Sequence, residues 1–267
     1  MIVSYSHNMI FVHIPKNGGT TIESLLKPFL NPDSDLHVSK VADPAFTEAV
    51  AEKSLRFRLR KHMAAHQIRK VVLPEVYRSM FSFAFSRNPY SRCFSAFSFM
   101  SDRAAMDQRR AAKGLDPTPR PWRQPDFDRG AFLNAAFDEV CTDLPKVAAA
   151  HGLFRPQVHW LPEPDSVTFV GRLETLSQDL HQVYRQIGLP TEGLATIPHE
   201  NVKAEAGSWR GMSAASAAAI REFYAADFAR FGYDPDFAGP DFTGPEFPAP
   251  PAAPALASPA PQSTPFS

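Results

Sequence analysis

Apolar runs alternate with helix-like patterns along most of this chain. Three short apolar runs predict buried strands, at residues 9–14, 79–86 and 167–170. Apolar residues at helical spacing predict helices at residues 20–30 and 173–187, a helix that begins at Pro89, and a last helix at residues 213–231. Gly171 is expected to end the third strand. Strands that alternate with helices predict an α/β fold built on a central parallel sheet.

Two stretches depart from this alternation. Residues 101–130 contain four prolines and seven Lys or Arg residues, which predicts a partly helical excursion, or lid, on the substrate side. Residues 239–267 hold nine of the 26 prolines of the chain and no basic residue, which predicts a disordered tail rich in Pro and Ala. One folded domain is therefore expected at residues 1–238.

A short loop after the first predicted strand has the pattern of an anion site. The sequence FVHIPKNGGTTIESLL places lysine, asparagine and two glycines directly before a predicted helix. The free N–H groups at the start of a helix attract negative charge, and Gly18 and Gly19 let the backbone approach a ligand closely. Thr20 and Thr21 can cap the helix and donate hydroxyl groups to phosphate oxygens. The expected ligand is a phosphate group.

Lys16 adds a positive charge to this loop, but its position excludes one well-known motif. In a Walker A loop the lysine follows the glycines, whereas here it precedes them and the loop is shorter. A glycine-rich turn with an exposed lysine is the alternative interpretation, because short glycine loops alone are weak evidence.

A second basic motif leaves the next predicted strand. In the sequence FAFSRNPYSRCFSAF, Arg87 stands where α/β sheets hold their ligands, and Arg92 and Ser95 share one face of the helix that follows. An arginine and a serine at one point predict a second phosphate site, since a guanidinium group can grip two oxygens. The alternative is an arginine that pairs with a structural carboxylate.

Composition narrows the class of protein. The chain has 267 residues, 44% of them hydrophobic, with 28 basic and 28 acidic residues, so the net charge of zero argues against a general nucleic-acid binder. Cys93 and Cys141 have no metal-ligand spacing and allow at most one disulfide, and Cys93 is expected to be a buried thiol. No segment resembles a signal peptide or a membrane span, which leads us to expect a soluble, cytoplasmic protein.

The two motifs together resemble those of sulfotransferases that use 3′-phosphoadenosine 5′-phosphosulfate (PAPS). FVHIPKNGGTTIESLL is similar to the 5′-phosphosulfate loop of that family, and RNPYSRCFSAF is similar to its 3′-phosphate motif. The segments FVGRLETLSQDL and DFARFGYDPDF extend the likeness over residues 11–236. The branch they resemble holds Golgi-type carbohydrate enzymes, including the heparan 2-O and chondroitin 4-O sulfotransferases, and their bacterial relatives. Departures from the family pattern are Asn17, Ser86 and Phe97.

The resemblance implies a fold, a donor and a set of site residues. The fold would be a P-loop-like central parallel sheet flanked by helices, and PAPS would donate its sulfuryl group without a metal. Lys16 would stabilise the leaving phosphate, and Arg87 and Ser95 would bind the 3′-phosphate. The remaining donor-binding residues would be Asn17, Gly18, Gly19, Thr20 and Thr21 in the loop, and Trp209 and Arg210 in a later segment.

A sugar hydroxyl needs a base to remove its proton. The basic, helix-like segment RLRKHMAAHQIRK offers His62 and His66, and the family pattern favours His62, whose cationic neighbours would keep it neutral. The spacing of the two also resembles a helical metal pair, although no third ligand is evident. His13 is expected to be structural, and each tryptophan, including Trp160, is expected to pack rather than to stack on a ligand.

The acceptor is the least defined partner. Basic clusters at residues 53–70 and 103–129 favour an anionic glycan through electrostatic steering, although solvated charged faces fit them equally well. Two other function classes stay open: a nucleotide or small-molecule kinase, and a catalytically silent nucleotide-binding adaptor that engages a partner through the Pro-rich tail. Nothing in the sequence defines an oligomeric state.

Overall fold

A computed structural model describes residues 1–38, 44–46, 59–114, 136–192, 194 and 212–236. The strands are β1 (Ile2–Ser4), β2 (Met9–Val12), β3 (Leu36–His37), β4 (Phe81–Ser86) and β5 (Phe169–Arg172). The helices are α1 (Gly19–Leu26), α3 (Ala65–Val72), α4 (Pro74–Ser79), α5 (Pro89–Ala111), α6 (Phe137–Cys141), α7 (Leu144–Ala150), α8 (Leu176–Gln186), α9 (Ala214–Phe223) and α10 (Ala225–Phe231). Short 3-10 helices occupy Lys27–Phe29, Pro44–Phe46, Gly152–Phe154, Gln157–His159 and Leu173–Thr175.

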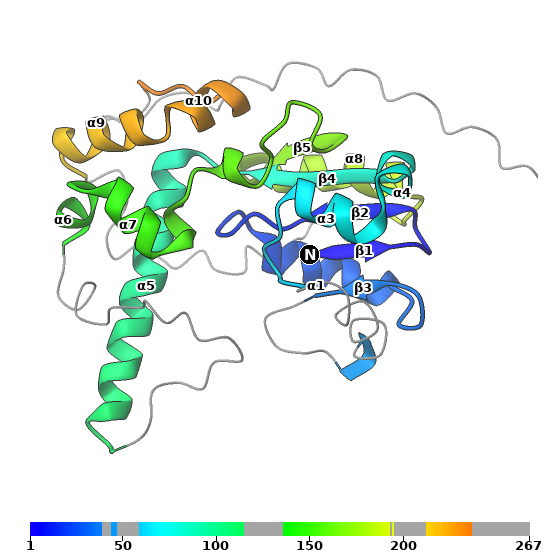
Figure 1. Cartoon of the computed structure of the whole chain (residues 1–267), viewed down its shortest axis with the longest axis horizontal. Coiled ribbons are helices and arrows are strands. Elements are labelled where there is room, and N and C mark those ends of the chain that lie inside the picture. The colour runs from blue at the N-terminus through cyan, green and yellow to red at the C-terminus, as the bar shows by residue number, and fades with distance from the viewer. Residues whose placement is uncertain (39–43, 47–58, 115–135, 193, 195–211, 237–267) are drawn as a thin grey trace, which may run out of the picture.

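The strands form one sheet in the order β3-β1-β2-β4-β5 (Figure 1). Strands β2, β4 and β5 pair in parallel, while β1 pairs antiparallel with both β2 and β3. This arrangement confirms the α/β fold with a mainly parallel central sheet. Strands β1 and β3 were not predicted, because three-residue and two-residue strands leave too short a pattern to recognise.

Each face of the sheet supports its own apolar core. Phe81, Phe83 and Phe85 of β4 point to the face covered by α1 and α8, and Phe83 stacks on Phe11 with ring centroids 5.2 Å apart. Ala84 points to the opposite face, where α3, α4, α5, α7, α9 and α10 contribute the apolar side chains. The alternation follows from the two-residue period of a strand. Strands β2 and β4 are buried on both faces, which is typical of the inner parallel strands of α/β proteins, while the edge strand β5 alternates buried and half-buried residues.

Several boundaries differ from the predicted ones. Gly171 lies inside β5 rather than ending it, because the ring of Phe85 occupies the place of a side chain, 2.6 Å from where a Cβ would stand. The last predicted helix is two helices that meet at Tyr224, whose hydroxyl donates to the carbonyl of Phe154 at 2.6 Å. Strand β4 begins at Phe81, after Ser79 has ended α4.

The predicted lid begins as regular helix. Helix α5 starts at Pro89 as expected and continues to Ala111, so the first part of residues 101–130 extends away from the sheet as one rod (Figure 1). Residues 115–130 of that segment and the tail at 239–267 lie outside the described residues. Cys93 and Cys141 are both buried and both free, which confirms Cys93 as a buried thiol.

Candidate active site

The predicted anion loop connects β2 to α1 at the carboxyl end of the parallel strands. Gly18 is the N-cap residue with a left-handed φ of 72°, and no side chain caps the helix. The prediction that Thr20 and Thr21 cap α1 is therefore wrong. The helix begins at Gly19, one residue earlier than expected, so both threonines lie inside its first turn. Thr20 is exposed and Thr21 is buried, both within the first turn. The first-turn N–H groups are left for an anion.

Gly19 is required by its contact with the segment that precedes it. A Cβ at this position would clash with the imidazole ring of His13, which follows β2 directly. At Gly18 a Cβ would stand 2.5 Å from Cδ1 of Leu173. The two glycines therefore hold the loop close to its own strand and to the segment after β5.

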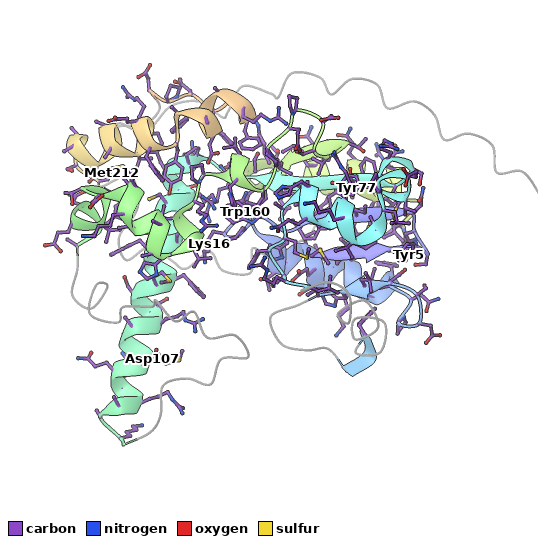
Figure 2. All side chains as sticks on the ribbon, in the orientation of Figure 1. Tyr5, Lys16, Tyr77, Asp107, Trp160 and Met212 are labelled. Atoms are coloured by element: carbon purple, nitrogen blue, oxygen red, sulfur yellow. The ribbon has the colours of Figure 1, made fainter. Side chains whose placement is uncertain are left out.

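Lys16 has an unusual backbone for a lysine, with φ at 71°. That conformation costs about 1–2 kcal/mol for a residue with a side chain. The carbonyl of Lys16 accepts a hydrogen bond from Arg87 Nη1 at 3.2 Å, which helps to hold it. Its Nζ lies 4.5 Å from the ring centroid of Phe99 on α5, and Arg103 lies 5.4 Å from the same ring. Figure 2 shows Lys16 at the end of the sheet nearest α5.

Arg87 places the second predicted phosphate site beside the first. It follows β4, which pairs in parallel with β2, so the two loops leave the same edge of the sheet. Its Nε donates to Ser91 Oγ at 3.0 Å, and burial lowers the pKa of its guanidinium group. Ser95 lies half-buried one turn further along α5. The structure thus brings the loop, Arg87 and the first turns of α5 together.

Arg92 has a different role from the one that its place in the motif suggests. The side chain is 1% exposed, and its three nitrogens donate to the carbonyls of Pro15, Arg155 and Leu153 at 3.1, 2.9 and 3.2 Å. Its guanidinium carbon also lies 5.5 Å from the ring of Trp160, which is buried as predicted. Arg92 therefore supports the loop from behind instead of binding a phosphate.

His62 lies in a turn before α3, and its ring has one defined partner. Nδ1 faces the carbonyl of His13 at 3.1 Å, and since a carbonyl only accepts, Nδ1 carries the proton and Nε2 has the lone pair. His62 is exposed as a whole residue, but the protein surrounds much of its ring. This desolvation, together with the neighbouring His13, holds the pKa of His62 well below its usual value. The backbone carbonyl of His62 accepts from Trp160 Nε1 at 3.2 Å.

The sequence placed His62 and His66 in one helix-like segment, at the spacing of a helical pair. Helix α3 begins only at Ala65, so the two side chains do not share a helix face. The metal-pair interpretation therefore loses its geometric basis. Among the described residues, no three His, Cys, Asp or Glu side chains gather as metal ligands would.

His13 belongs to a buried charge cluster that the sequence did not reveal. Its Nδ1 donates to Glu23 Oε1 at 2.8 Å, and Glu23 also contacts Lys61 Nζ at 2.7 Å and the amino group of Met1 at 3.0 Å. Burial lowers the pKa of His13 to about 4, despite Glu23. Burial alone would raise the pKa of Glu23, but the hydrogen bond from His13 and the nearby cations hold it far below the usual range. The ring of His13 meets that of His62 edge to face, with centroids 4.6 Å apart.

Two further groups join the loops, the half-buried Glu174 and the buried Gln157, and neither of them was assigned a role from the sequence. Glu174, in the glycine-arginine-glutamate segment after β5, accepts from Asn88 N at 2.7 Å and from the hydroxyl of Tyr233 at 2.9 Å. Gln157 bonds to both predicted phosphate motifs. Only Glu174 lies in a segment that the sequence analysis singled out, and no local pattern shows the partners of either residue, because these lie far away along the chain.

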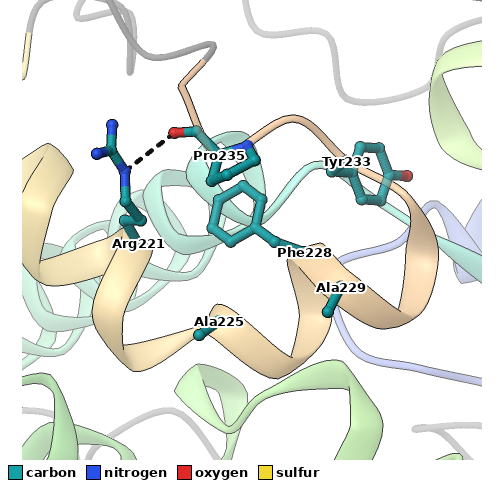
Figure 3. A pocket seen from close by; sticks show the side chains of 6 residues that line it. All are labelled: Arg221, Ala225, Phe228, Ala229, Tyr233 and Pro235. Atoms are coloured by element: carbon teal, nitrogen blue, oxygen red, sulfur yellow. Dashed lines mark hydrogen bonds between the residues drawn. The ribbon is translucent and has the colours of Figure 1, made fainter.

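A cavity of about 270 Å³ lies elsewhere, against α9 and α10 (Figure 3). Its lining is mostly apolar and is formed by Arg221, Ala225, Phe228, Ala229, Tyr233 and Pro235. None of these is a predicted site residue. The hydroxyl of Tyr233 points away from this cavity and bonds to Ser86 and Glu174. The one cation among these lining residues, Arg221, already pairs with Asp236, so the cavity suits a phosphate less well than the loops do.

The fold and these loops define an α/β protein with a helix start that no side chain caps, at α1, and a second basic group after the neighbouring strand. The chain belongs to the sulfotransferase family, whose model matches residues 1–234. The chemistry of that family is sulfuryl transfer.

Searches of curated proteins and of solved structures found no match. Within the described ranges, no helix has the length and apolar character to cross a membrane. Trp209, Arg210 and Trp122 lie outside the described residues, so their predicted roles stay predictions.

Proposed function

We propose that this sulfotransferase transfers the sulfuryl group of PAPS to a hydroxyl group of a carbohydrate acceptor. The observation that carries the proposal is that the two predicted anion-binding motifs lie side by side, one at the start of α1 and one at Arg87. A donor nucleotide with phosphates at both ends fits two such sites. Positioning and charge stabilisation can accomplish most of this transfer, as they do in phosphoryl transfer.

The loop residues would hold the 5′ end of the donor. The uncapped N–H groups of α1 and the hydroxyls of Thr20 and Thr21 would bind the 5′-phosphate, and Gly18 and Gly19 leave room for it. Lys16 would neutralise the charge that develops on the leaving phosphate, swinging its ammonium group away from Phe99. When bound, PAPS supplies an activated sulfuryl group.

The 3′-phosphate would be bound by the next strand. Arg87 would grip two of its oxygens, and Ser95 would donate its hydroxyl group. Burial of Arg87 favours this role, because a partly desolvated guanidinium group gains more from a phosphate than one in water does. By the family resemblance, Trp209 and Arg210 would also contribute to donor binding.

His62 would act as the general base for the acceptor hydroxyl. Its Nδ1 is engaged by the carbonyl of His13, so Nε2 is the atom that can accept the proton. The depressed pKa keeps that atom unprotonated near neutral pH.

Charge near the loop favours an acceptor with an anionic group. Exposed Arg155 supplies this charge, on the segment that Arg92 ties to the loop, and its Nη1 donates to Nε2 of exposed His159 at 3.3 Å. Burial and the charge of Arg155 lower the pKa of His159, so that ring contributes hydrogen bonding and not charge near neutral pH. Lys61 is less useful for steering than its cluster suggested, because it pairs with the buried Glu23. We therefore place the proposed glycan contact at Arg155 and His159.

Calorimetry with adenosine 3′,5′-bisphosphate, adenosine 5′-phosphate and ATP tests the identity of the donor. Adenosine 3′,5′-bisphosphate should bind more tightly than adenosine 5′-phosphate, and Arg87→Ala should erase most of that difference. A charge-assisted hydrogen bond contributes about 1.5–3 kcal/mol, or roughly 10- to 150-fold in affinity. Arg185→Ala, an exposed arginine near the end of α8, is the matched control and should change nothing.

Equal affinity for the two nucleotides in the natural protein would refute the donor assignment. Tight binding of ATP without a preference for the bisphosphate would support a kinase instead. Transfer of labelled sulfate to a panel of neutral and anionic glycans then separates an enzyme from a silent adaptor and identifies the acceptor class.

A further inference from the structure

Gln157 occupies the space between the two anion sites and is fully buried. Its Oε1 accepts from Asn17 Nδ2 in the loop at 2.7 Å and from the backbone N–H of Arg87 at 2.9 Å. Its Nε2 donates to the carbonyl of Arg87 at 2.9 Å and to Asp227 Oδ2 at 3.3 Å. One side chain therefore contacts both motifs directly.

The amide group is the only side-chain chemistry that satisfies this arrangement. An amide offers two lone pairs on oxygen and two N–H donors, and all four are used here. The backbone of Arg87 is bonded through both its N–H and its carbonyl, much as a strand is bonded to its neighbour. These two hydrogen bonds fix the backbone of Arg87 just after β4, and the fixed backbone orients its guanidinium group.

Gln157 is itself held by elements outside β2 and β4. Asp227 on α10 accepts from the backbone N–H of Gln157 at 2.7 Å and of Val158 at 2.9 Å. Arg92 holds the carbonyls of Leu153 and Arg155 just before it in the chain. The side chain thus projects between the motifs from a fixed support.

We propose that Gln157 is a positioning residue that fixes the distance between the 5′- and 3′-phosphate sites, so that both phosphates of one nucleotide bind together. The inference rests on the proposed PAPS function. Asn17 also bonds directly to β4, from Nδ2 to the carbonyl of Phe85 at 2.6 Å, so the loop keeps one link to the second motif when Gln157 is replaced. What Gln157 contributes is their mutual placement, which is a form of preorganisation.

Calorimetry of Gln157→Met with three ligands tests this role. Methionine keeps the volume of the side chain but can make none of the four hydrogen bonds. The affinities for adenosine 5′-phosphate and adenosine 3′-phosphate should each fall less than threefold, while that for the 3′,5′-bisphosphate should fall at least about tenfold, or about 1.4 kcal/mol. Gln186→Met, at the end of α8, is the matched control and should leave all three unchanged.

A general loss of structure gives a different result, since it lowers all three affinities together with the melting temperature. If Gln157→Met does not fold, Asn17→Ala removes both bonds that Asn17 Nδ2 makes, to Gln157 and to the carbonyl of Phe85, and should show the same selective loss for the bisphosphate. A variant that folds and keeps the full preference for the bisphosphate overturns the positioning role of Gln157 but leaves the PAPS assignment standing. A natural protein without that preference overturns the PAPS assignment and this inference with it.

Discussion

At the scale of single residues, the site depends on which atoms of each side chain are already engaged. Arg92 and Arg87 are five residues apart, yet all three nitrogens of Arg92 bond to backbone carbonyls, whereas Arg87 is partly exposed at the loop. His62 is constrained in the same way, because the carbonyl of His13 fixes its tautomer. The role of each residue thus follows from its partners rather than from its type.

Replacement of the proposed base should slow the chemical step and spare donor binding. His62→Ala should lower kcat by about 10²- to 10⁴-fold, the usual contribution of a general base. Its affinity for adenosine 3′,5′-bisphosphate should stay nearly unchanged, because the base faces the acceptor. Steady-state kinetics and calorimetry check the two parts, with His66→Ala as the control that keeps its rate.

The proposed role of His62 also predicts the direction in which kcat changes with pH. A base must be unprotonated, and the pKa of His62 is held below its usual value, so kcat should be flat near neutral pH and fall only on the acidic side. Lys16→Ala should lower kcat and keep this acidic limb, since it acts on the leaving group. If His66→Ala loses activity and His62→Ala does not, the base is His66.

At the scale of elements, the start of α1 depends on how closely it packs against the residue after β2. His13 occupies the space that a side chain at Gly19 would need, and Glu23 one turn later in the same helix holds the imidazole ring in place. Strand, loop and helix therefore form a closed unit around one ring. A side chain at Gly19 has to displace that ring or the helix.

Gly19→Ala should therefore damage the loop, and Gly152→Ala should not. Overpacking of a tight site costs about 1–3 kcal/mol of unfolding free energy, and the displaced first turn should also lose nucleotide affinity. At Gly152 the nearest atom to a new Cβ is Arg155 Nε at 3.9 Å, which is ordinary contact. Urea unfolding and calorimetry on both variants check this, and equal behaviour of the two would contradict the packing argument.

At the scale of the whole molecule, two apolar cores on the two faces of the sheet account for the fold. They draw on residues from Met1 to Tyr233, while the cation-free, Pro-rich stretch after residue 238 has little apolar content. The family match also ends at residue 234. The domain boundary at residue 238 stays a prediction of composition.

Removal of residues 239–267 should leave binding intact. A chain that ends at residue 238 should bind adenosine 3′,5′-bisphosphate within about twofold of the full chain and melt within a few degrees of it, because the tail cannot pack a core. Calorimetry and thermal denaturation compare the two forms. A large loss of affinity would show instead that the tail contributes to the donor site.

The sequence by itself determined the parallel strands, the helices after them and the two basic motifs. Each of these signals is local: an apolar run, a helical period, or glycines beside a lysine can be recognised within some fifteen residues. The neighbouring strands then brought the two motifs to one edge of the sheet, as the α/β pattern predicts. The chain's membership of the sulfotransferase family agrees with that interpretation.

Only the tertiary structure decided how the motif residues are used. Gln157 lies 140 residues from Asn17 and 70 from Arg87, so no local pattern could connect them. The same holds for Gly171, whose neighbour is the ring of Phe85, and for Arg92, whose carbonyl partners include Arg155, 63 residues away. Hydrogen bonding and packing act through space, and a buried polar group takes whatever partner the fold brings within about 3 Å.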